Sequence, residues 1–157
     1  MNIDDLLREE DAGWTELHSL IDPLSPAEAQ APGYFREGWS VKDLIGHLGS
    51  WLAEAGVALE RINVGTYRAG ELDIDAKNDE FLDALRPLTL RENQAQAEAA
   101  RTQTLRTLRS LPEVSEEAAW WIEKAGPAHY AKHLPRLREW VEELRSERAR
   151  PTITREP

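Results

Sequence analysis

Hydrophobic residues recur at intervals of three and four along most of this chain, which is the pattern of helices that bury one face. In the first segment the recurring positions are Ile3, Leu7, Glu10, Trp14, Leu17 and Ile21. All of them except Glu10 are apolar, so we expect a helix with a buried stripe from about residue 4 to 21. Asp22-Pro23 should end it, because the residue before a proline is disfavoured in the helical conformation.

The clearest helical pattern follows Ser40. Its buried stripe is expected at Val41, Leu44, Ile45, Leu48, Leu52, Ala55, Leu59 and Ile62. Ser40 should cap this helix, with Asp43 at the third helical position. Residues 23–39 carry several Pro and Gly residues, and Ser25-Pro26-Ala27-Glu28 has the form of a capping box. We therefore predict a long ordered loop with one short helical turn before the second helix.

The second half of the chain predicts further helices. Residues 73–86 and 89–110 should be two helical pieces with a break near Pro87, and residues 113–125 a connector that holds two tryptophans. The last helix should run from Pro127 to about Arg148, with Pro135 bending it just after His133. No segment alternates strictly between apolar and polar residues, so we predict no strand. The expected fold is all-α, a four-helix bundle.

Composition adds limits on size, partners and location. At 157 residues the chain fits one domain, expected at residues 1–149, with a disordered tail at 150–157. A formal charge of −10 opposes binding to nucleic acid, and no apolar run is long enough to span a bilayer. The first residues lack the features of a signal peptide, so a cytoplasmic protein is expected. We expect a small-molecule substrate as partner and leave a homodimer open.

The histidines are the candidates for a metal site. His129 and His133 are four residues apart, which places both imidazoles on one face of the last helix, and His47 lies beside the buried stripe of the second. Three imidazoles fill three positions of a tetrahedral ion and leave the fourth open, as in catalytic zinc sites. The plainer interpretation is that each histidine is a half-buried polar residue with one hydrogen bond. His18 is interpreted as a surface or edge residue.

A shared ion would also constrain the direction of the helices. His47 lies in the second turn of its helix and His129 in the first turn of its own. If one ion binds both, the two helix starts should lie at the same end of the bundle. The second and last helices are therefore predicted to run roughly parallel.

Two stretches resemble the DinB/YfiT-like superfamily of metal-dependent enzymes: Gly38-Trp39-Ser40-Val41-Lys42-Asp43-Leu44-Ile45-Gly46-His47-Leu48-Gly49-Ser50-Trp51 and, some eighty residues later, His129-Tyr130-Ala131-Lys132-His133. The order and spacing of the resemblance extend over residues 1–148. It implies a four-helix bundle in which a W-S-x-K-D-x-x-x-H-L helix supplies one metal ligand and a late H-x-x-x-H helix supplies two. Carried over by position, His47, His129 and His133 are the ligands.

Other residues near these motifs are weaker candidates for substrate binding or catalysis. Trp51 and Trp140 are candidate walls of a substrate pocket, although tryptophans at helical positions more often belong to a core. Asp43 and Glu54 lie one turn before and two turns after His47, so either can orient an imidazole or act as general base. A solvated carboxylate is the commoner role of such residues in an acidic chain.

The chain has no cysteine, so a nucleophile held by the ion must come from outside the protein. The superfamily implies water, which gives a hydrolase, or a low-molecular-weight thiol such as bacillithiol or mycothiol, which gives a thiol S-transferase or an isomerase, acting on a small electrophile. Zinc or nickel is the divalent ion expected for nitrogen ligands. The alternative is a stress-related module that binds or sequesters a small molecule without catalysis. A role in DNA repair is disfavoured, because the net charge of −10 repels the DNA backbone. For an acidic thiol we expect a basic contact at Lys42, Lys132 or Arg136.

Overall fold

The computed structural model describes residues 2–35 and 38–150. Within these ranges the chain forms helices and no strand, as the sequence predicts. The helices are α1 (Ile3–Ile21), α2 (Pro26–Gln30), α3 (Val41–Asn63), α4 (Ile74–Leu85), α5 (Leu90–Ser110), α6 (Glu116–Ala125) and α7 (Pro127–Arg148). The disordered tail predicted at 150–157 lies, from residue 151 on, outside the described residues.

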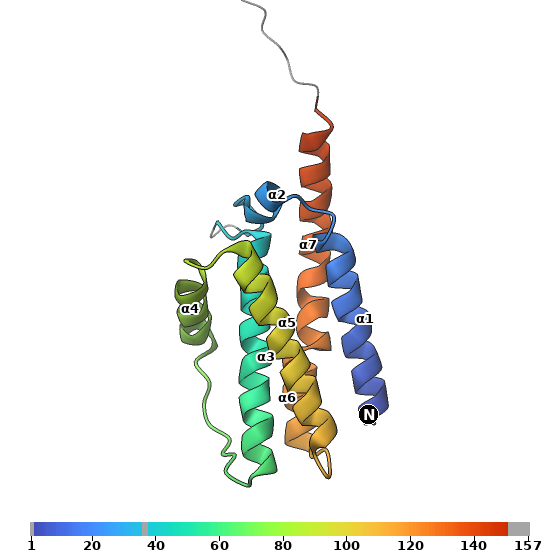
Figure 1. The fold of residues 1–157 in the computed structure, drawn as a ribbon, viewed down its shortest axis with the longest axis vertical. Coiled ribbons are helices and arrows are strands. Elements are labelled where there is room, and N and C mark those ends of the chain that lie inside the picture. Colours follow the sequence, from blue (N-terminus) through green and yellow to red (C-terminus); the bar gives the residue numbers. More distant parts are fainter. Residues whose placement is uncertain (1, 36–37, 151–157) are drawn as a thin grey trace, which may run out of the picture.

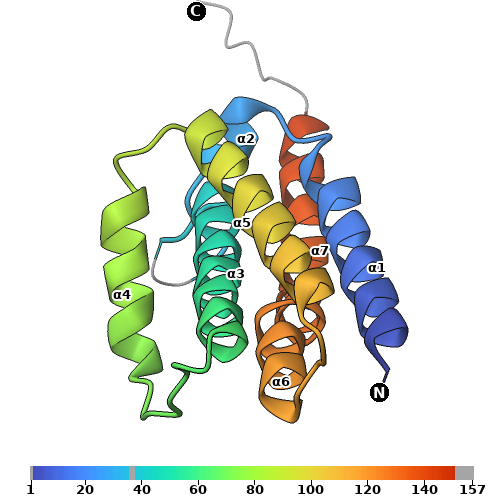
Figure 2. The same ribbon diagram turned by 60° about the horizontal axis from the view of Figure 1, so that its bottom comes forward.

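Four long helices, α1, α3, α5 and α7, form a bundle (Figures 1 and 2). α3 packs along α5, and α7 packs along α1. The close approach of α3 to α5 needs glycine, because a Cβ at Gly49 would lie 2.8 Å from Ala97 and one at Gly56 would lie 2.6 Å from the Thr104 hydroxyl. The all-α bundle predicted from the sequence is confirmed.

Three capping boxes form, and they include the one predicted at Ser25 and Glu28 and the cap predicted at Ser40. Ser25 with Glu28, Ser40 with Asp43, and Thr89 with Glu92 each exchange side-chain and backbone hydrogen bonds at the start of α2, α3 and α5. The break near Pro87 is also present, since α4 ends at Leu85 and α5 begins at Leu90. α7 continues as a helix across Pro135.

The predicted connector at 113–125 is wrong in part, because most of it is the helix α6. The side chain of Ser115 accepts a hydrogen bond from the backbone N–H of Ala118 and so caps this helix. Its buried residues are Ala118, Trp121, Ile122 and Ala125. That spacing of three, one and three residues is the pattern of a helix with one buried face.

The predicted parallel direction of the two histidine helices is also wrong. α3 and α7 run in opposite directions in both ribbon views (Figures 1 and 2). The reason is α6, which packs against α3, where Leu59 clusters with Ala118 and Ile122. α6 occupies the fourth position of the bundle beside the last turns of α3, so α7 begins partway along the bundle. Its first turn therefore lies beside the first turns of an antiparallel α3.

Glu10, the one polar residue in the α1 stripe, is completely buried. Its carboxylate accepts hydrogen bonds from Arg101 Nε and Nη2, both at 2.7 Å, and from the Tyr130 hydroxyl at 2.9 Å. Burial without these partners would be very unfavourable, because an unpaired buried charge loses its hydration. This network joins α1, α5 and α7 next to the first turn of α7.

α4 differs from the other helices because it buries none of its own residues. It packs against α3, where Asn78 accepts a hydrogen bond from Trp51 Nε1 at 2.8 Å. Among the described residues, no helix is long and apolar enough to cross a membrane.

Candidate metal centre

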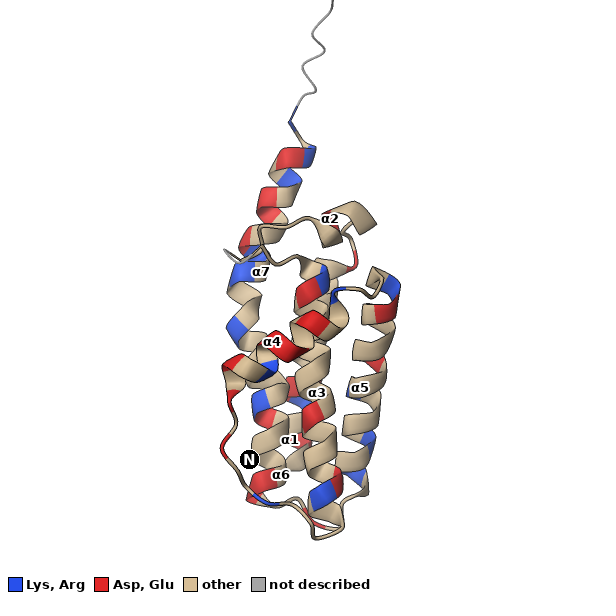
Figure 3. Cartoon of the chain, turned by 90° about the vertical axis from the view of Figure 1, so that its left-hand side faces the viewer, with Lys and Arg blue, Asp and Glu red and all other residues tan. Residues whose placement is uncertain are grey.

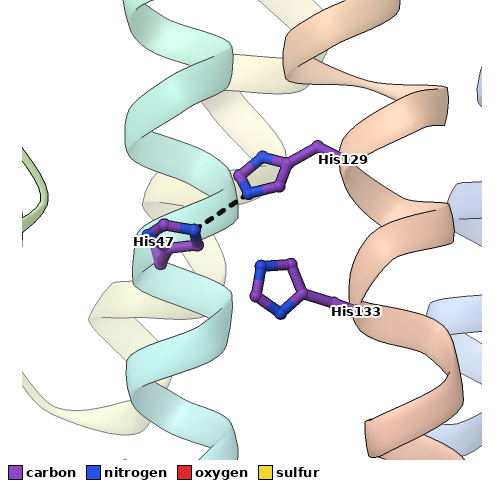
Figure 4. A group of neighbouring side chains, drawn as sticks. All are labelled: His47, His129 and His133. Atoms are coloured by element: carbon purple, nitrogen blue, oxygen red, sulfur yellow. Dashed lines mark hydrogen bonds between the residues drawn. The ribbon is translucent and has the colours of Figure 1, made fainter. Parts of the chain in front are cut away.

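Three imidazoles from two helices converge inside the bundle (Figure 4). The Nε2 atoms of His47 on α3 and His129 on α7 are 2.9 Å apart. The ring of His133 lies 5.3 Å from that of His47 and 5.0 Å from that of His129, measured between ring centroids. One nitrogen from each ring lies within 4.8 Å of the others. The sequence-predicted ligands are thus brought together.

Local structure sets each position. The capping box of Ser40 and Asp43 fixes the first turn of α3, so His47 follows in its second turn. Gly126 and Pro127 open α7, so His129 lies in the first turn and His133 in the second. The two α7 imidazoles therefore face the same way, toward α3, one turn apart.

The imidazoles are held neutral. His47 and His133 are 8% and 7% exposed. Burial, with smaller effects from the neighbouring imidazoles and Lys132, lowers the pKa of His47 to about 2. Burial likewise lowers the pKa of His129 to about 3 and that of His133 to about 4, helped by the charge of Lys132. Neutral imidazoles offer the lone pairs that metal coordination requires.

His133 is oriented by Tyr34, which sequence reasoning did not assign to the site. The Tyr34 hydroxyl is 3.2 Å from His133 Nδ1 and 3.4 Å from the His133 carbonyl oxygen. A phenol has one hydrogen to donate. When it goes to the carbonyl, the phenolic oxygen accepts Nδ1–H, which leaves the Nε2 lone pair of His133 free for an ion. Burial raises the pKa of Tyr34, so the phenol stays protonated.

The loop before α3 holds Tyr34 in place. Arg136 of α7 donates to the backbone carbonyls of Tyr34 at 2.7 Å and Gly33 at 3.1 Å. Two further aromatic rings of this loop adjoin the imidazoles: Trp39 at 5.1 Å from His47 and Phe35 at 5.7 Å from His133, between centroids. The aromatic content of residues 34–39 was the sequence signal for this wall. Residues 36 and 37 lie outside the described ranges.

His47 has a second ring nitrogen, Nδ1, in addition to the Nε2 atom that faces His129. Nδ1 of His47 is buried and has no hydrogen-bond partner among the residues that the structure describes. His47 also lines a cavity of about 10 Å³, together with residues that include Asp43 and Asn78. One oxygen of Asp43, Oδ2, accepts hydrogen bonds from the Ser40 backbone and hydroxyl at 2.9 and 3.1 Å. Asp43 is therefore a capping residue that also lines this cavity with His47.

A divalent ion fits this donor set. Tetrahedral zinc binds imidazole nitrogen at about 2.0–2.1 Å, which places two ligand nitrogens about 3.3 Å apart. The separations observed here, from 2.9 Å to no more than 4.8 Å, bracket that value. Within residues 2–35 and 38–150, no fourth His, Asp or Glu joins the three histidines as a ligand.

The chain matches the family model described as mycothiol maleylpyruvate isomerase N-terminal domain over residues 11–144. It belongs to this family. The family has the DinB/YfiT-like helical fold, so the superfamily resemblance is confirmed, and it is associated with mycothiol-related enzymes. A solved structure of an uncharacterised protein from Escherichia coli UTI89 is similar with a TM-score of 0.76 and 16% identity, covering 90% of this chain and 94% of that one. At this identity the likeness shows the fold. No curated protein matches the chain.

Three of the weaker candidates contact residues other than the three histidines. Glu54 pairs with Lys77 of α4 at 3.4 Å. Trp51 packs edge-on against Phe81 at 5.4 Å between centroids, and Trp140 lies under the Arg136 guanidinium at 5.6 Å. The roles predicted for Trp51 and Trp140 in binding substrate, and for Asp43 and Glu54 as bases, stay predictions.

Lys42, Lys132 and Arg136, the basic residues expected near the pocket, differ in their contacts. Lys42 donates to the carbonyl of Arg86 at 3.0 Å. Arg136 is bound to the loop carbonyls and pairs with Glu143 at 2.9 Å. Lys132 is exposed and close enough for its charge to lower the pKa of all three imidazoles. Of the three, Lys132 is the one whose charge acts on the imidazoles.

His18, interpreted from the sequence as a surface or edge residue, lies outside the centre on α1. Its Nδ1 is 3.0 Å from the Asp22 carboxylate, and its side chain is 38% exposed.

Proposed function

We propose that this protein is a metal-dependent enzyme that transfers a low-molecular-weight thiol, such as mycothiol, to a small electrophile or uses that thiol to isomerise it. The observation that carries the proposal is the convergence of three neutral imidazoles without a fourth protein ligand among the described residues. Such a site keeps one coordination position for an external group. The ion, when bound, lowers the pKa of a thiol and so favours the nucleophilic thiolate.

The residues of the chain supply orientation, charge and shielding. His47, His129 and His133 hold the ion, and Tyr34 fixes the ring of His133. Lys132 adds a positive charge that favours an anionic sulfur. Trp39 and Phe35 cover the imidazoles on the loop side and limit the access of water. The absence of cysteine means that the sulfur comes from the cosubstrate.

The family association favours the thiol over water as the nucleophile. Zinc or nickel is the proposed ion, because both bind imidazole well. If water took the open position instead, the same site would act as a hydrolase. A module that only sequesters a small molecule would bind its ligand without turnover.

The test uses tag-free, metal-loaded protein with 1-chloro-2,4-dinitrobenzene and, in separate reactions, mycothiol, bacillithiol, glutathione or no thiol. In the expected reaction the thiol sulfur forms the new S–C bond, the C–Cl bond breaks, chloride leaves with the electron pair, and the thiol proton goes to solvent. Turnover that requires a thiol and is lost in His133→Ala supports the proposal. Thiol-independent turnover would indicate a hydrolase, and ligand binding without turnover would indicate the sequestering module.

A further inference from the structure

A groove of about 520 Å³ lies between α3, α6 and the segment 64–73 that leads from α3 to α4. Figure 3 shows this segment passing α6 at the foot of the bundle before it reaches α4. The residues that matter most in its lining are Arg61, Tyr67, Arg68, Leu72, Trp120 and Trp121. We call it the α3–α6 groove. Its volume is in the range of about 300–1,000 Å³ that is usual for small-molecule sites.

The α3–α6 groove continues the face of α3 that carries His47. Glu54 and Arg61, which line the groove, follow His47 by two and four helical turns and so point in nearly the same direction. With a rise of 1.5 Å per residue, the groove begins about 10 Å from His47 along the helix axis. On the other side, the α6 residues of the groove lead through Gly126 into the first turn of α7.

Large apolar side chains in this groove are exposed to water. Trp120 is 47% exposed, Val57 43% and Leu72 39%. These are three of the five large hydrophobic residues that are exposed in the described part of the chain. Such clustering in a concave site indicates a surface that is covered by a ligand. An indole ring that is half in water is suited to stacking on a flat ring.

Two cations of this groove are available to a ligand. Neither Arg61 nor Arg68 forms an ion pair with another described residue, although the chain carries 29 acidic residues. Four carboxylates, Glu54, Glu71, Glu116 and Glu117, also line the groove. Glu71 forms no ion pair with another described residue. Glu54 pairs with Lys77, and Glu116 and Glu117 stand in the first turn of α6, where the helix dipole favours them.

The wall opposite α3 is held in place. The backbone N–H of Tyr67 donates to the carbonyl of Arg61 at 3.1 Å, and its hydroxyl accepts from Trp121 Nε1 at 3.1 Å. The segment 64–73 is therefore tied to both α3 and α6. A preformed groove binds a ligand more tightly because less conformational entropy is lost.

From these observations we infer that the α3–α6 groove binds a ring-bearing organic anion, with its flat ring on Trp120 and its anionic group at Arg61 and Arg68. In the context of the proposed function, on which this last step rests, the groove holds the part of an elongated substrate that is remote from the reacting atom. Such a substrate must extend at least about 10 Å from the metal centre.

The test uses the fluorescent probe 8-anilinonaphthalene-1-sulfonate, an aromatic anion, and its uncharged analogue N-phenyl-1-naphthylamine. Both are titrated into metal-free protein. Trp120→Ala should weaken binding of both probes about fivefold, whereas Trp120→Phe, which keeps a ring, should restore most of it. Arg61→Gln combined with Arg68→Gln should weaken only the sulfonate, again about fivefold. Arg106→Gln, an exposed arginine on α5, is the matched control and should change neither.

Unchanged affinities in the Trp120 and double arginine variants, or no saturable binding of the sulfonate, would overturn the inference. So would an equal loss of both probes in the arginine variant, since the charge would then not be recognised. The same titration in His47→Ala separates this inference from the metal centre, because the groove should bind the probe with unchanged affinity there. Competitive inhibition of thiol-dependent turnover by the sulfonate, with an inhibition constant raised about fivefold in Trp120→Ala, would place the remote part of the substrate in the groove. Inhibition that is not competitive would contradict that placement.

Discussion

The hydroxyl of Tyr34 lies 3.2 Å from Nδ1 of His133, although the two residues are 99 positions apart in the sequence. Both side chains are buried, and Arg136 holds the backbone of Tyr34 against α7. A partner on the second ring nitrogen sets the tautomer and the orientation of a metal-binding histidine. The loop before α3 is thereby part of the candidate metal centre.

Replacing Tyr34 with Phe should weaken metal binding about tenfold, because His133 loses the group that orients its ring. The dissociation constant, measured by competition with a chelator, checks this expectation. Tyr67→Phe removes a tyrosine hydrogen bond of similar length, to Trp121, away from the metal centre and is the control. Equal affinities in Tyr34→Phe and the unmodified protein would show that Tyr34 does not orient the ligand.

Removal of the Glu10 carboxylate should destabilise the fold. Glu10→Ala leaves Arg101 and Tyr130 without their shared partner, and breaking a buried ion pair in this way costs about 3 kcal/mol. Urea unfolding followed by circular dichroism measures this change in the free energy of unfolding. Asp11→Ala, which removes an exposed partner of the same arginine, should cost less than about 1 kcal/mol. A similar, small effect of both variants would contradict a structural role for the buried network.

Acid should destabilise the metal-free protein. In the unfolded chain the histidines take up protons below about pH 6.5, whereas in the fold His129 has a pKa lowered to about 3 by burial. The unfolded state then binds more protons between these values, so stability falls as the pH falls from 6.5. For His129 the loss at pH 5 is about 2 kcal/mol. The free energy of unfolding, measured at pH 7.5, 6 and 5, should show this decline. Its slope against pH should be smaller in His129→Ala. An equal slope in both proteins would mean that His129 is not held neutral.

The candidate bases can be separated by turnover. Asp43→Asn should reduce thiol-dependent turnover more than Glu54→Gln, because Asp43 borders the cavity beside His47 whereas Glu54 is paired with Lys77. Asparagine still offers a side-chain oxygen to the Ser40 backbone, so the melting temperature should change little. If Glu54→Gln reduced turnover more than Asp43→Asn, Glu54 would be the more important carboxylate.

The helices and the placement of His129 and His133 on one helix face were predictable from the sequence because they depend on local signals. The Ser40 cap, the break near Pro87 and the one-turn spacing of His129 and His133 each act within a few residues. The parallel direction predicted for α3 and α7 failed because it assumed that α7 starts at an end of the bundle. That start depends on α6, whose stripe at Ala118, Trp121 and Ile122 was present in the sequence but was interpreted as a connector.

The contacts of Tyr34 and Glu10 could not be predicted, since both arise from residues distant in sequence. Glu10 gave a signal as the polar interruption of an apolar stripe, which indicates a buried charge with a partner. The identity of that partner, Arg101, follows only from the packing of α1 on α5 and α7. Tyr34 gave no signal beyond its place in an aromatic loop.

The metal content of protein purified without a histidine tag tests the three-histidine centre most directly. Inductively coupled plasma mass spectrometry should find close to one divalent ion per chain, zinc or nickel. Single substitutions of His47, His129 or His133 by Ala should release it, while His18→Ala, which changes a histidine bound to Asp22 on α1, should not. Metal content that stays the same in all three ligand variants would contradict the site.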